Sequence, residues 1–170
     1  MLDRIESVEQ LEDMLSEPSQ EVIEALGRLQ GDILILGVGG KIGPSLARMA
    51  RRASDAAGAR SRVIGVDKFP DPAQQAKLRE GGIETISCDL LGPGELSKLP
   101  DADNVVFMVG MKFGSTGQEA LTWALNAYLP GLVCQRFASS RIAAVSTGNI
   151  YGLTPVTLGG SVETDEPNPE

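Results

Sequence analysis

The chain has 170 residues, with 15 Lys and Arg against 23 Asp and Glu, no histidine and a net charge of −8 at pH 7. Its length suits one domain with a real hydrophobic core, and its acidic balance argues against binding to nucleic acid or to anionic membranes. Without histidine it lacks the commonest metal ligand and every nucleophile that a histidine would activate. Cys88 and Cys134 have no metal-binding spacing, so we expect no metal site.

No signal peptide is visible, and no apolar run approaches the roughly 20 residues that a membrane helix needs. We therefore expect a cytoplasmic protein without a membrane span. Its two cysteines should then be reduced thiols.

Residues 1–30 are predicted to form an N-terminal helical extension. Apolar residues recur at helical spacing over 5–15 and again over 22–29, and Ser7 or Ser19 could cap the helices. We expect this extension to pack on the edge of the domain, with a partner subunit as the alternative.

Residues 32–43 predict a strand, a glycine-rich turn and the start of a helix. The run 33–36 is apolar at every position, which is typical of a central strand in a parallel sheet covered by helices. Such a strand, turn and helix form the architecture that binds a dinucleotide pyrophosphate. The candidate cofactor contacts in this stretch are Gly37, Gly40, Lys41, Ile42 and Gly43.

The three spaced glycines have separate expected roles. Gly37 permits a sharp turn at the strand end, Gly40 lets the backbone approach the phosphates, and Gly43 lets the helix pack closely. The helix N-terminus then offers N–H groups and a partial positive charge to the anion. A glycine-rich turn without a ligand is the alternative interpretation.

An acid ends the next predicted strand, which spans 62–67 and follows a helix over 42–57. Asp67 can accept hydrogen bonds from both ribose hydroxyls of adenosine and would repel a 2′-phosphate, which favours NAD over NADP. Lys68 weakens this preference, because a cation here could meet a 2′-phosphate. The alternative role for Asp67 is to cap a turn or a helix.

The rest of the chain continues this alternation. A helix over 73–80, a strand over 83–88 and a helical turn over 95–99 precede a strand over 104–110. A long helix over 120–137 follows, with Ser115 or Thr116 as its expected cap and Pro130 as a candidate kink. The last predicted strand is 141–145.

Five strands alternating with helices predict an α/β fold with a doubly wound, Rossmann-like parallel sheet over 31–160. Ligands bind such a sheet at the carboxyl ends of its strands, where all the candidates fall: 37–43, Asp67, Asp89, 110–112 and 146–147. Residues 161–170 are acidic and contain proline, so they are predicted to be extended or mobile.

These residues together resemble the extended short-chain dehydrogenase/reductase family, in particular its NAD-dependent sugar-nucleotide epimerases and dehydratases. The resemblance covers roughly residues 32–170. It is carried by Gly37-x-x-Gly40-x-x-Gly43, Asp67, Asp89-Leu90, the stretch Val109-Gly110-Met111-Lys112, Asn126, and the run from Ser146 and Thr147 to Tyr151-Gly152.

The resemblance implies further site residues. Asp89 and Leu90 would lie beside the adenine, and Val109, Gly110, Met111 and Lys112 along the nicotinamide half, with Ser146 as a further cofactor contact. Thr147 takes the position of the family's catalytic hydroxyl. Alternatively, Thr147 satisfies backbone groups, Lys112 is solvated, and Asn126 joins its helix to the neighbouring strand.

One family feature is missing. The general acid/base of the family is the tyrosine of a Tyr-x-x-x-Lys motif, and neither Tyr128 nor Tyr151 has a lysine four residues later. By analogy the motif would fall just past Glu170. We therefore expect the cofactor-binding, N-terminal part of a longer oxidoreductase, inactive alone, that acts on a sugar nucleotide or related small molecule by reversible hydride transfer.

A non-catalytic NAD(P)-binding sensor or scaffold is the alternative. Family members often pair through the long helices that follow strands four and five. Only the first of these, over 120–137, is present here, so a homodimer is left as an open expectation.

Overall fold

The computed structural model describes residues 4–111 and 114–168. Five parallel strands form one sheet in the order β3-β2-β1-β4-β5. The strands are β1 (Ile33–Leu36), β2 (Val63–Asp67), β3 (Glu84–Ser87), β4 (Asn104–Phe107) and β5 (Arg141–Ala144). This arrangement confirms the predicted doubly wound α/β fold.

Strand β1 lies at the centre because it can be buried on both faces. All four of its side chains are buried, and it pairs with β2 on one side and β4 on the other, so that Ile35 is in register with Gly65 and Val106. A strand whose faces are both covered needs no polar alternation, which is why this run is continuously apolar.

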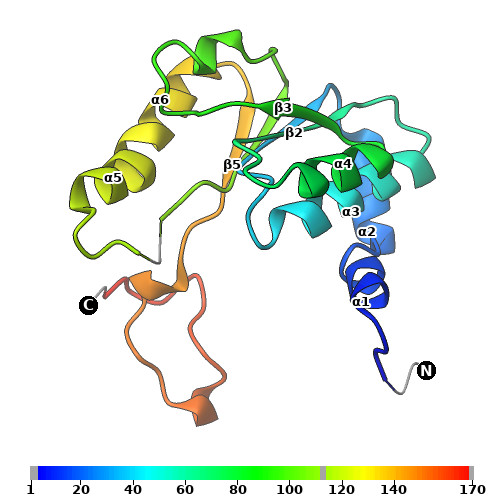
Figure 1. Cartoon of the computed structure of the whole chain (residues 1–170). Coiled ribbons are helices and arrows are strands. Elements are labelled where there is room, and N and C mark those ends of the chain that lie inside the picture. Colours follow the sequence, from blue (N-terminus) through cyan, green and yellow to red (C-terminus); the bar gives the residue numbers. More distant parts are fainter. Residues whose placement is uncertain (1–3, 112–113, 169–170) are drawn as a thin grey trace.

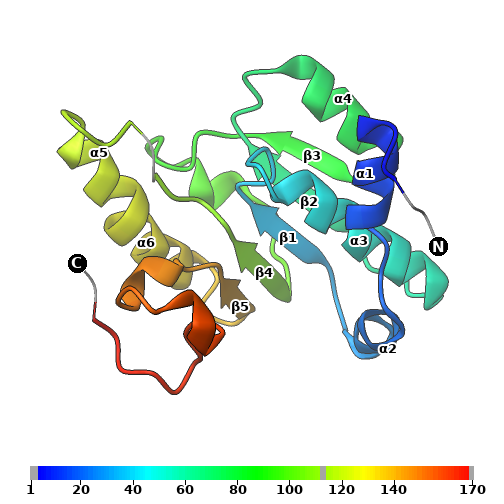
Figure 2. The ribbon, with the colours of Figure 1, turned by 90° about the horizontal axis from the view of Figure 1, so that it is seen from below.

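Helices cover the two faces of the sheet unequally (Figures 1 and 2). One face carries α3 (Gly43–Ala56) and α4 (Pro72–Glu80), with α1 (Val8–Leu15) and α2 (Gln20–Arg28) beyond α3. The other face carries α5 (Glu119–Trp123), the π-helical segment η2 (Ala124–Tyr128) and α6 (Leu129–Arg136). Short 3-10 turns are η1 (Leu96–Lys98), η3 (Gly148–Ile150) and η4 (Val156–Leu158).

Two hydrophobic clusters follow from this layering. Leu34 and Leu36 point to the α6 face, where Leu129, Val133 and Phe137 cover them. Alternate residues of the same strand point to the α3 face, where the cluster is formed by Ile33, Ile35, Val38, Ala47, Val63, Phe69, Leu78 and Ile83. Side chains of one strand therefore bind together both helical layers.

The N-terminal helices begin where the sequence predicts. Ser7 accepts a hydrogen bond from Gln10 N at 3.1 Å, and Ser19 accepts one from Val22 N at 3.4 Å. Each serine thus satisfies one of the amide groups that a helix start leaves unpaired.

The long helix predicted over 120–137 differs from expectation. Neither Ser115 nor Thr116 caps it: Gln118 occupies the N-cap, and its side chain makes no capping hydrogen bond. The helix is also not continuous, because η2 separates α5 from α6 and Pro130 lies in the first turn of α6. Proline has no N–H to donate to the preceding turn, so it is suited to a first turn rather than to a helix interior.

Three strands end earlier than predicted. β3, β4 and β5 end at Ser87, Phe107 and Ala144, although Met108 N still donates to Leu36 O and Val145 N to Phe107 O. After β5 the chain leaves the sheet, and residues 145–168 project from the body as an arm (Figure 1). Pro169 and Glu170 of the predicted acidic tail lie outside the described residues.

Candidate functional site

A cleft of about 240 Å³ opens at the carboxyl edge of the sheet. Its lining comes from the segments that follow β1, β2, β3 and β4 and from the helical layer of η2 and α6. The lining residues are Gly37, Gly40, Asp67, Lys68, Cys88, Asp89, Leu90, Leu91, Met108, Val109, Gly110, Leu125 and Leu129. Eight residues predicted separately along the sequence, Gly37, Gly40, Asp67, Lys68, Asp89, Leu90, Val109 and Gly110, are thereby brought together.

The glycine turn is tightly packed at its two ends. Gly37 has a φ of +89°, which side chains rarely tolerate, and a Cβ there would lie 2.9 Å from Val109 Cγ2. At Gly43 a Cβ would lie 2.2 Å from Val38 O, a distance that no side chain can adopt without moving backbone. The turn and the close helix approach predicted for these glycines are both present.

Asp67 fastens the glycine turn to the end of β2. Its Oδ2 accepts a hydrogen bond from Gly39 N at 2.9 Å, and its Oδ1 accepts one from Lys68 N at 2.7 Å. Gln74 of α4 completes the clamp, because its Nε2 donates to Gly39 O at 3.0 Å. Each carboxylate oxygen retains a lone pair, so Asp67 can still accept hydrogen bonds from a ligand in the cleft.

Gly39 and Gln74 were not predicted as site residues. A Cβ on Gly39 would lie 2.9 Å from Asp67 Cγ, so this position also requires glycine. Gly39 stands inside the glycine-rich turn, where that signal was available. Gln74 is a polar residue in a helix, and nothing in the sequence pattern distinguishes it.

An ion pair joins the ends of β2 and β3 at the cleft. Lys68 Nζ lies 2.9 Å from Asp89 Oδ2, with both side chains more than half exposed. The hydrogen bond from Lys68 holds the pKa of Asp89 below its ordinary value, and the N–H of Leu91 adds to this. Phe69 anchors the segment behind the pair: it is buried, in the left-handed backbone region with a φ of +48°.

The floor of the cleft is apolar. Leu90 and Leu129 are buried there, and Val109 and Leu125 pack against the same cluster. Burial raises the pKa of the Cys88 thiol, which therefore stays protonated at neutral pH. An apolar wall beside carboxylates suits a flat heterocycle attached to a polar sugar.

The start of α3 follows the glycine turn that lines the cleft and has no side-chain cap. Ile42 stands at its N-cap, where its side chain cannot accept a hydrogen bond, and Pro44 lies in the first turn. The first turn contains no acidic residue, in a helix of 14 residues. Amide groups and the positive end of the helix dipole are thus left for an anion. The side chains of Lys41 and Ile42 are exposed and do not line the cleft.

The segment after β4 is fixed by Asn126 of η2. Its Oδ1 accepts from Met111 N at 2.7 Å and its Nδ2 donates to Met111 O at 2.9 Å. Asn126 therefore bridges helix and strand end, as one of its two predicted roles required. Met111 does not line the cleft, and Lys112 lies outside the described residues.

The two predicted hydroxyl residues lie apart from this cleft. Ser146 and Thr147 follow β5, are exposed and are not among the residues that line it. Within residues 4–111 and 114–168, no group of three or more Cys, Asp or Glu side chains is arranged to hold a metal ion. In the same described part, no helix is long and apolar enough to cross a membrane.

The sheet order and the helical layers define a Rossmann-like α/β domain with a cleft at the carboxyl edge of its sheet. A solved structure with the same fold is the ADP-L-glycero-D-manno-heptose-6-epimerase of Helicobacter pylori. It superposes with a TM-score of 0.68 and 19% sequence identity, over 89% of this chain and 48% of the epimerase chain. At this identity the likeness shows the fold alone. Scans of protein-family models and of curated proteins find no match.

Proposed function

We propose that the cleft binds a nicotinamide dinucleotide, with NAD preferred over NADP. The observation that carries the proposal is Asp67, which ends β2, holds the glycine turn through Gly39 N and lines the cleft with unused lone pairs. An acid at this point can accept both ribose hydroxyls of an adenosine, and its charge disfavours a 2′-phosphate.

The residues present fit the other parts of such a cofactor. The uncapped start of α3, reached over Gly40, would hold the pyrophosphate. The apolar floor formed by Leu90 and Leu129 would take the adenine, with Asp89 at its edge. Val109 and Gly110 would follow the nicotinamide half. When bound, the dinucleotide supplies a hydride acceptor and donor.

The Lys68–Asp89 ion pair supports the preference for NAD. A free lysine beside Asp67 could attract a 2′-phosphate, but the charge of Lys68 is engaged by Asp89 at 2.9 Å. A 2′-phosphate would have to compete with this carboxylate for Lys68 and would also face the charge of Asp67.

We propose further that this domain serves an epimerase- or dehydratase-type oxidoreductase that acts on a sugar nucleotide or a related hydroxylated substrate. The chain spans about half the length of the epimerase structure that shares its fold, so the catalytic activity belongs to this proposal. Thr147 would hold a substrate hydroxyl. Residues 1–170 contain no Tyr-x-x-x-Lys motif, so in this proposal the tyrosine and lysine of that motif would lie outside them.

Titration calorimetry with NAD and NADP tests cofactor binding. The loss of hydrogen bonds to a charged group predicts that Asp67→Ala weakens NAD binding by about tenfold or more. Asp71→Ala is the matched control, because Asp71 is a nearby carboxylate that caps α4 and does not line the cleft. NAD affinity that is absent in folded protein, or unchanged in Asp67→Ala, would contradict the proposal.

A second measurement separates the enzyme from a non-catalytic sensor. Conversion of sugar nucleotides to epimerised or dehydrated products is followed by proton NMR, because such an enzyme returns the hydride and leaves no net reduced NAD; the assay uses this domain together with the proton-transferring region that the proposal requires. Product formation that falls in Thr147→Ala supports the oxidoreductase. Tight NAD binding without conversion of a sugar nucleotide would instead favour a sensor or scaffold.

A further inference from the structure

Helix α1 is amphipathic, and its apolar side faces away from the body. Val8, Leu11, Met14 and Leu15 are 64%, 39%, 45% and 53% exposed, and Ile5 just before the helix is 46% exposed. None of the residues of α1 itself is buried. A surface helix ordinarily turns such a stripe toward the core, so this orientation requires a cause.

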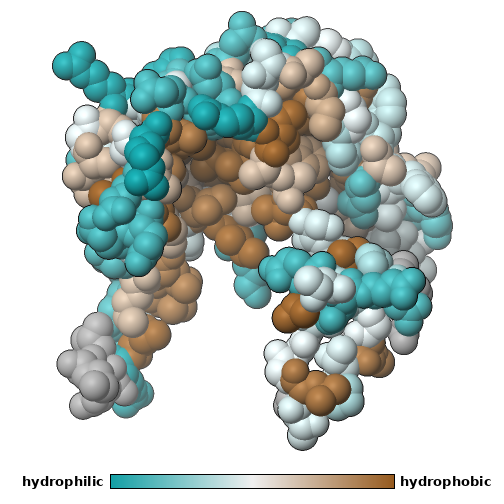
Figure 3. Space-filling model, turned by 180° about the vertical axis from the view of Figure 1, so that it is seen from behind, coloured by the Kyte–Doolittle hydropathy of each residue, from teal (hydrophilic) through white to brown (hydrophobic). Residues whose placement is uncertain are grey.

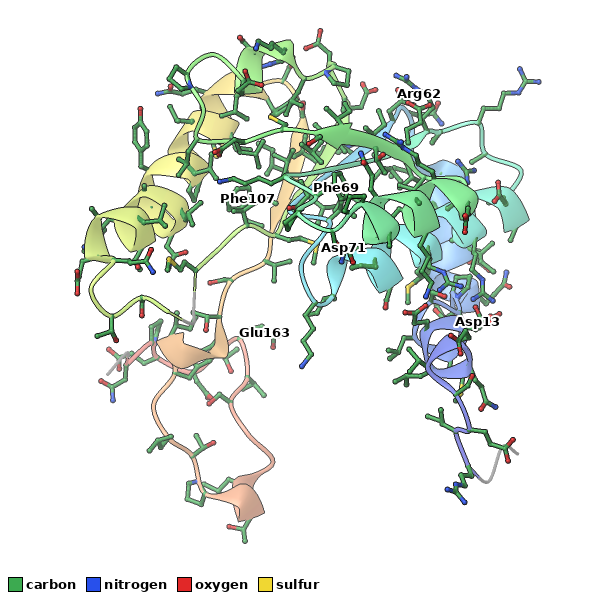
Figure 4. The ribbon with its side chains drawn as sticks, in the orientation of Figure 1. Asp13, Arg62, Phe69, Asp71, Phe107 and Glu163 are labelled. Carbon is green, nitrogen blue, oxygen red and sulfur yellow. The ribbon has the colours of Figure 1, made fainter. Side chains whose placement is uncertain are left out.

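The cause is a set of ion pairs on the polar side of the helix. Glu12 Oε2 lies 3.0 Å from Arg48 Nη1 and 2.6 Å from Lys77 Nζ. Asp13 Oδ1 lies 2.6 Å from Arg48 Nη2, and Asp13 is placed where α1 meets the body (Figure 4). The acidic side of α1 is thereby held against cations of α3 and α4.

Arg52 extends this attachment to the end of the helix. Its Nη1 donates to Asp13 O at 2.9 Å and to Ser16 Oγ at 3.1 Å, and its Nη2 forms an ion pair with Glu17. Ser16 is completely buried in this contact. Each surface pair contributes little alone, but several pairs in one network fix which side of α1 faces inward.

The outward stripe has the spacing of a helix-packing seam. Val8, Leu11 and Leu15 follow one another at intervals of three and four residues, the alternation by which one helix packs against another. The eight residues of α1 form a seam about 12 Å long. An exposed apolar stripe of this kind marks an interaction surface.

The charge around the seam selects the partner. Residues 4–30 contain seven carboxylates, of which Glu12, Asp13 and Glu17 pair with cations of the body. Glu6, Glu9, Glu21 and Glu24 are exposed and make no ion pair within the described residues. A second copy of the chain would bring two such acidic segments together, so like charges oppose self-association.

We propose that the seam of α1, defined by Val8, Leu11 and Leu15, docks a basic amphipathic helix of another protein. The partner's apolar residues would pack on the seam, and its lysines and arginines would meet the surrounding carboxylates. The surface lies on the N-terminal extension, so this docking does not depend on what the cleft binds.

A designed peptide tests the proposal by fluorescence anisotropy with the full chain. The probe is a labelled three-heptad peptide with leucine at positions a and d and lysine at e and g. Its control has the same composition, scrambled so that no leucine seam forms. Burial of two leucines predicts that the seam peptide binds about tenfold or more tightly than the scrambled peptide.

Matched variants locate the binding. In Leu11→Ser/Leu15→Ser the preference for the seam peptide should be lost, whereas Leu153→Ser/Leu158→Ser, which alters two more exposed leucines of the arm, should keep it. Circular dichroism checks that both variants are folded. Equal binding of the two peptides by the wild-type chain would overturn the proposal.

Two further results would assign the seam to another occupant and also overturn the proposal. One is a dimer in sedimentation experiments that dissociates in Leu11→Ser/Leu15→Ser. The other is binding to phosphatidylcholine vesicles that the same variant abolishes. A monomeric chain that does not bind vesicles and that prefers the seam peptide supports the proposal.

Discussion

The cleft and helix α1 are two candidate binding surfaces built on different principles. The cleft is concave and is formed by backbone turns at strand ends, with Gly43 packed against Val38 and Asp67 bonded to Gly39. The seam of α1 is convex and lies on one helix, held to the body by ion pairs.

This difference predicts different sensitivities. Steric contacts and backbone hydrogen bonds are insensitive to salt, so the cleft should respond to changes of volume. Exposed ion pairs are screened, so α1 should respond to changes of charge. On the back of the molecule, hydrophobic side chains gather over its middle (Figure 3).

The largest expected effect is at Gly43. In Gly43→Ala the new Cβ would lie 2.2 Å from Val38 O, so the backbone must move. We expect the free energy of unfolding to fall by about 1–3 kcal/mol and NAD binding to be lost. Gly131→Ala in α6 is the control, because a Cβ there meets nothing within 4 Å. It should stabilise by about 0.5–1 kcal/mol. Denaturant unfolding measures both, and equal effects would refute the packing argument.

The next effect concerns the attachment of α1. Arg48→Gln removes two ion pairs, and screening at about 1 M salt weakens the others, so amide exchange in α1 should accelerate about three- to tenfold. Exchange in β1 should not change. Acceleration in both regions alike would show that α1 is not a separately held element.

A smaller effect tests cofactor selectivity within the cleft. Asp89→Asn removes the charge that engages Lys68, which then becomes available to a 2′-phosphate. We expect the ratio of NADP to NAD affinity to rise by about twofold to fivefold, a gain typical of an exposed charge pair. Calorimetry with both dinucleotides measures it. A falling ratio would contradict the role given to Lys68.

The smallest expected effect is on the pH dependence of folding stability, through Asp32 at the amino end of β1. Hydrogen bonds from Arg62 to Asp32, at 2.6 and 2.9 Å from Nη2 and Nε, hold the pKa of Asp32 below its ordinary value. The stability that this adds is present above the unfolded pKa of about 3.9 and is lost as pH falls through the folded pKa.

Unfolding curves between neutral pH and about pH 3 should therefore be flatter for Asp32→Asn than for the wild type. Asp32 does not line the cleft, so the NAD affinity of Asp32→Asn at neutral pH should equal that of the wild type. A variant that titrates like the wild type would exclude Asp32 as a source of the acid sensitivity.

Local patterns predicted the fold well. The apolar run that forms β1 and the caps Ser7 and Ser19 depend on neighbours in the chain, so they could be identified from the sequence. The rule that parallel strands place their carboxyl ends at one edge of the sheet predicted most of the residues that line the cleft. Ser115 and Thr116 do not cap the helix because it begins at Glu119, three residues further along than a cap at Ser115 and two further than a cap at Thr116 would require.

What the sequence could not provide depends on contacts between distant segments. The clamp that links Gly39, Asp67 and Gln74 joins three elements, and no local pattern marks it. The periodicity of α1 predicted an amphipathic helix but not its orientation, because Arg48 and Lys77 decide which side faces inward.

The most direct test of dinucleotide binding is an NMR titration of the labelled chain with NAD. The account predicts that amide resonances of Gly39, Gly40, Gly43 and Gly110 shift together, that those of α1 do not, and that Asp67→Ala suppresses the shifts. A folded chain whose glycine-turn resonances remain unchanged at saturating NAD, or whose shifts centre on α1, would contradict it.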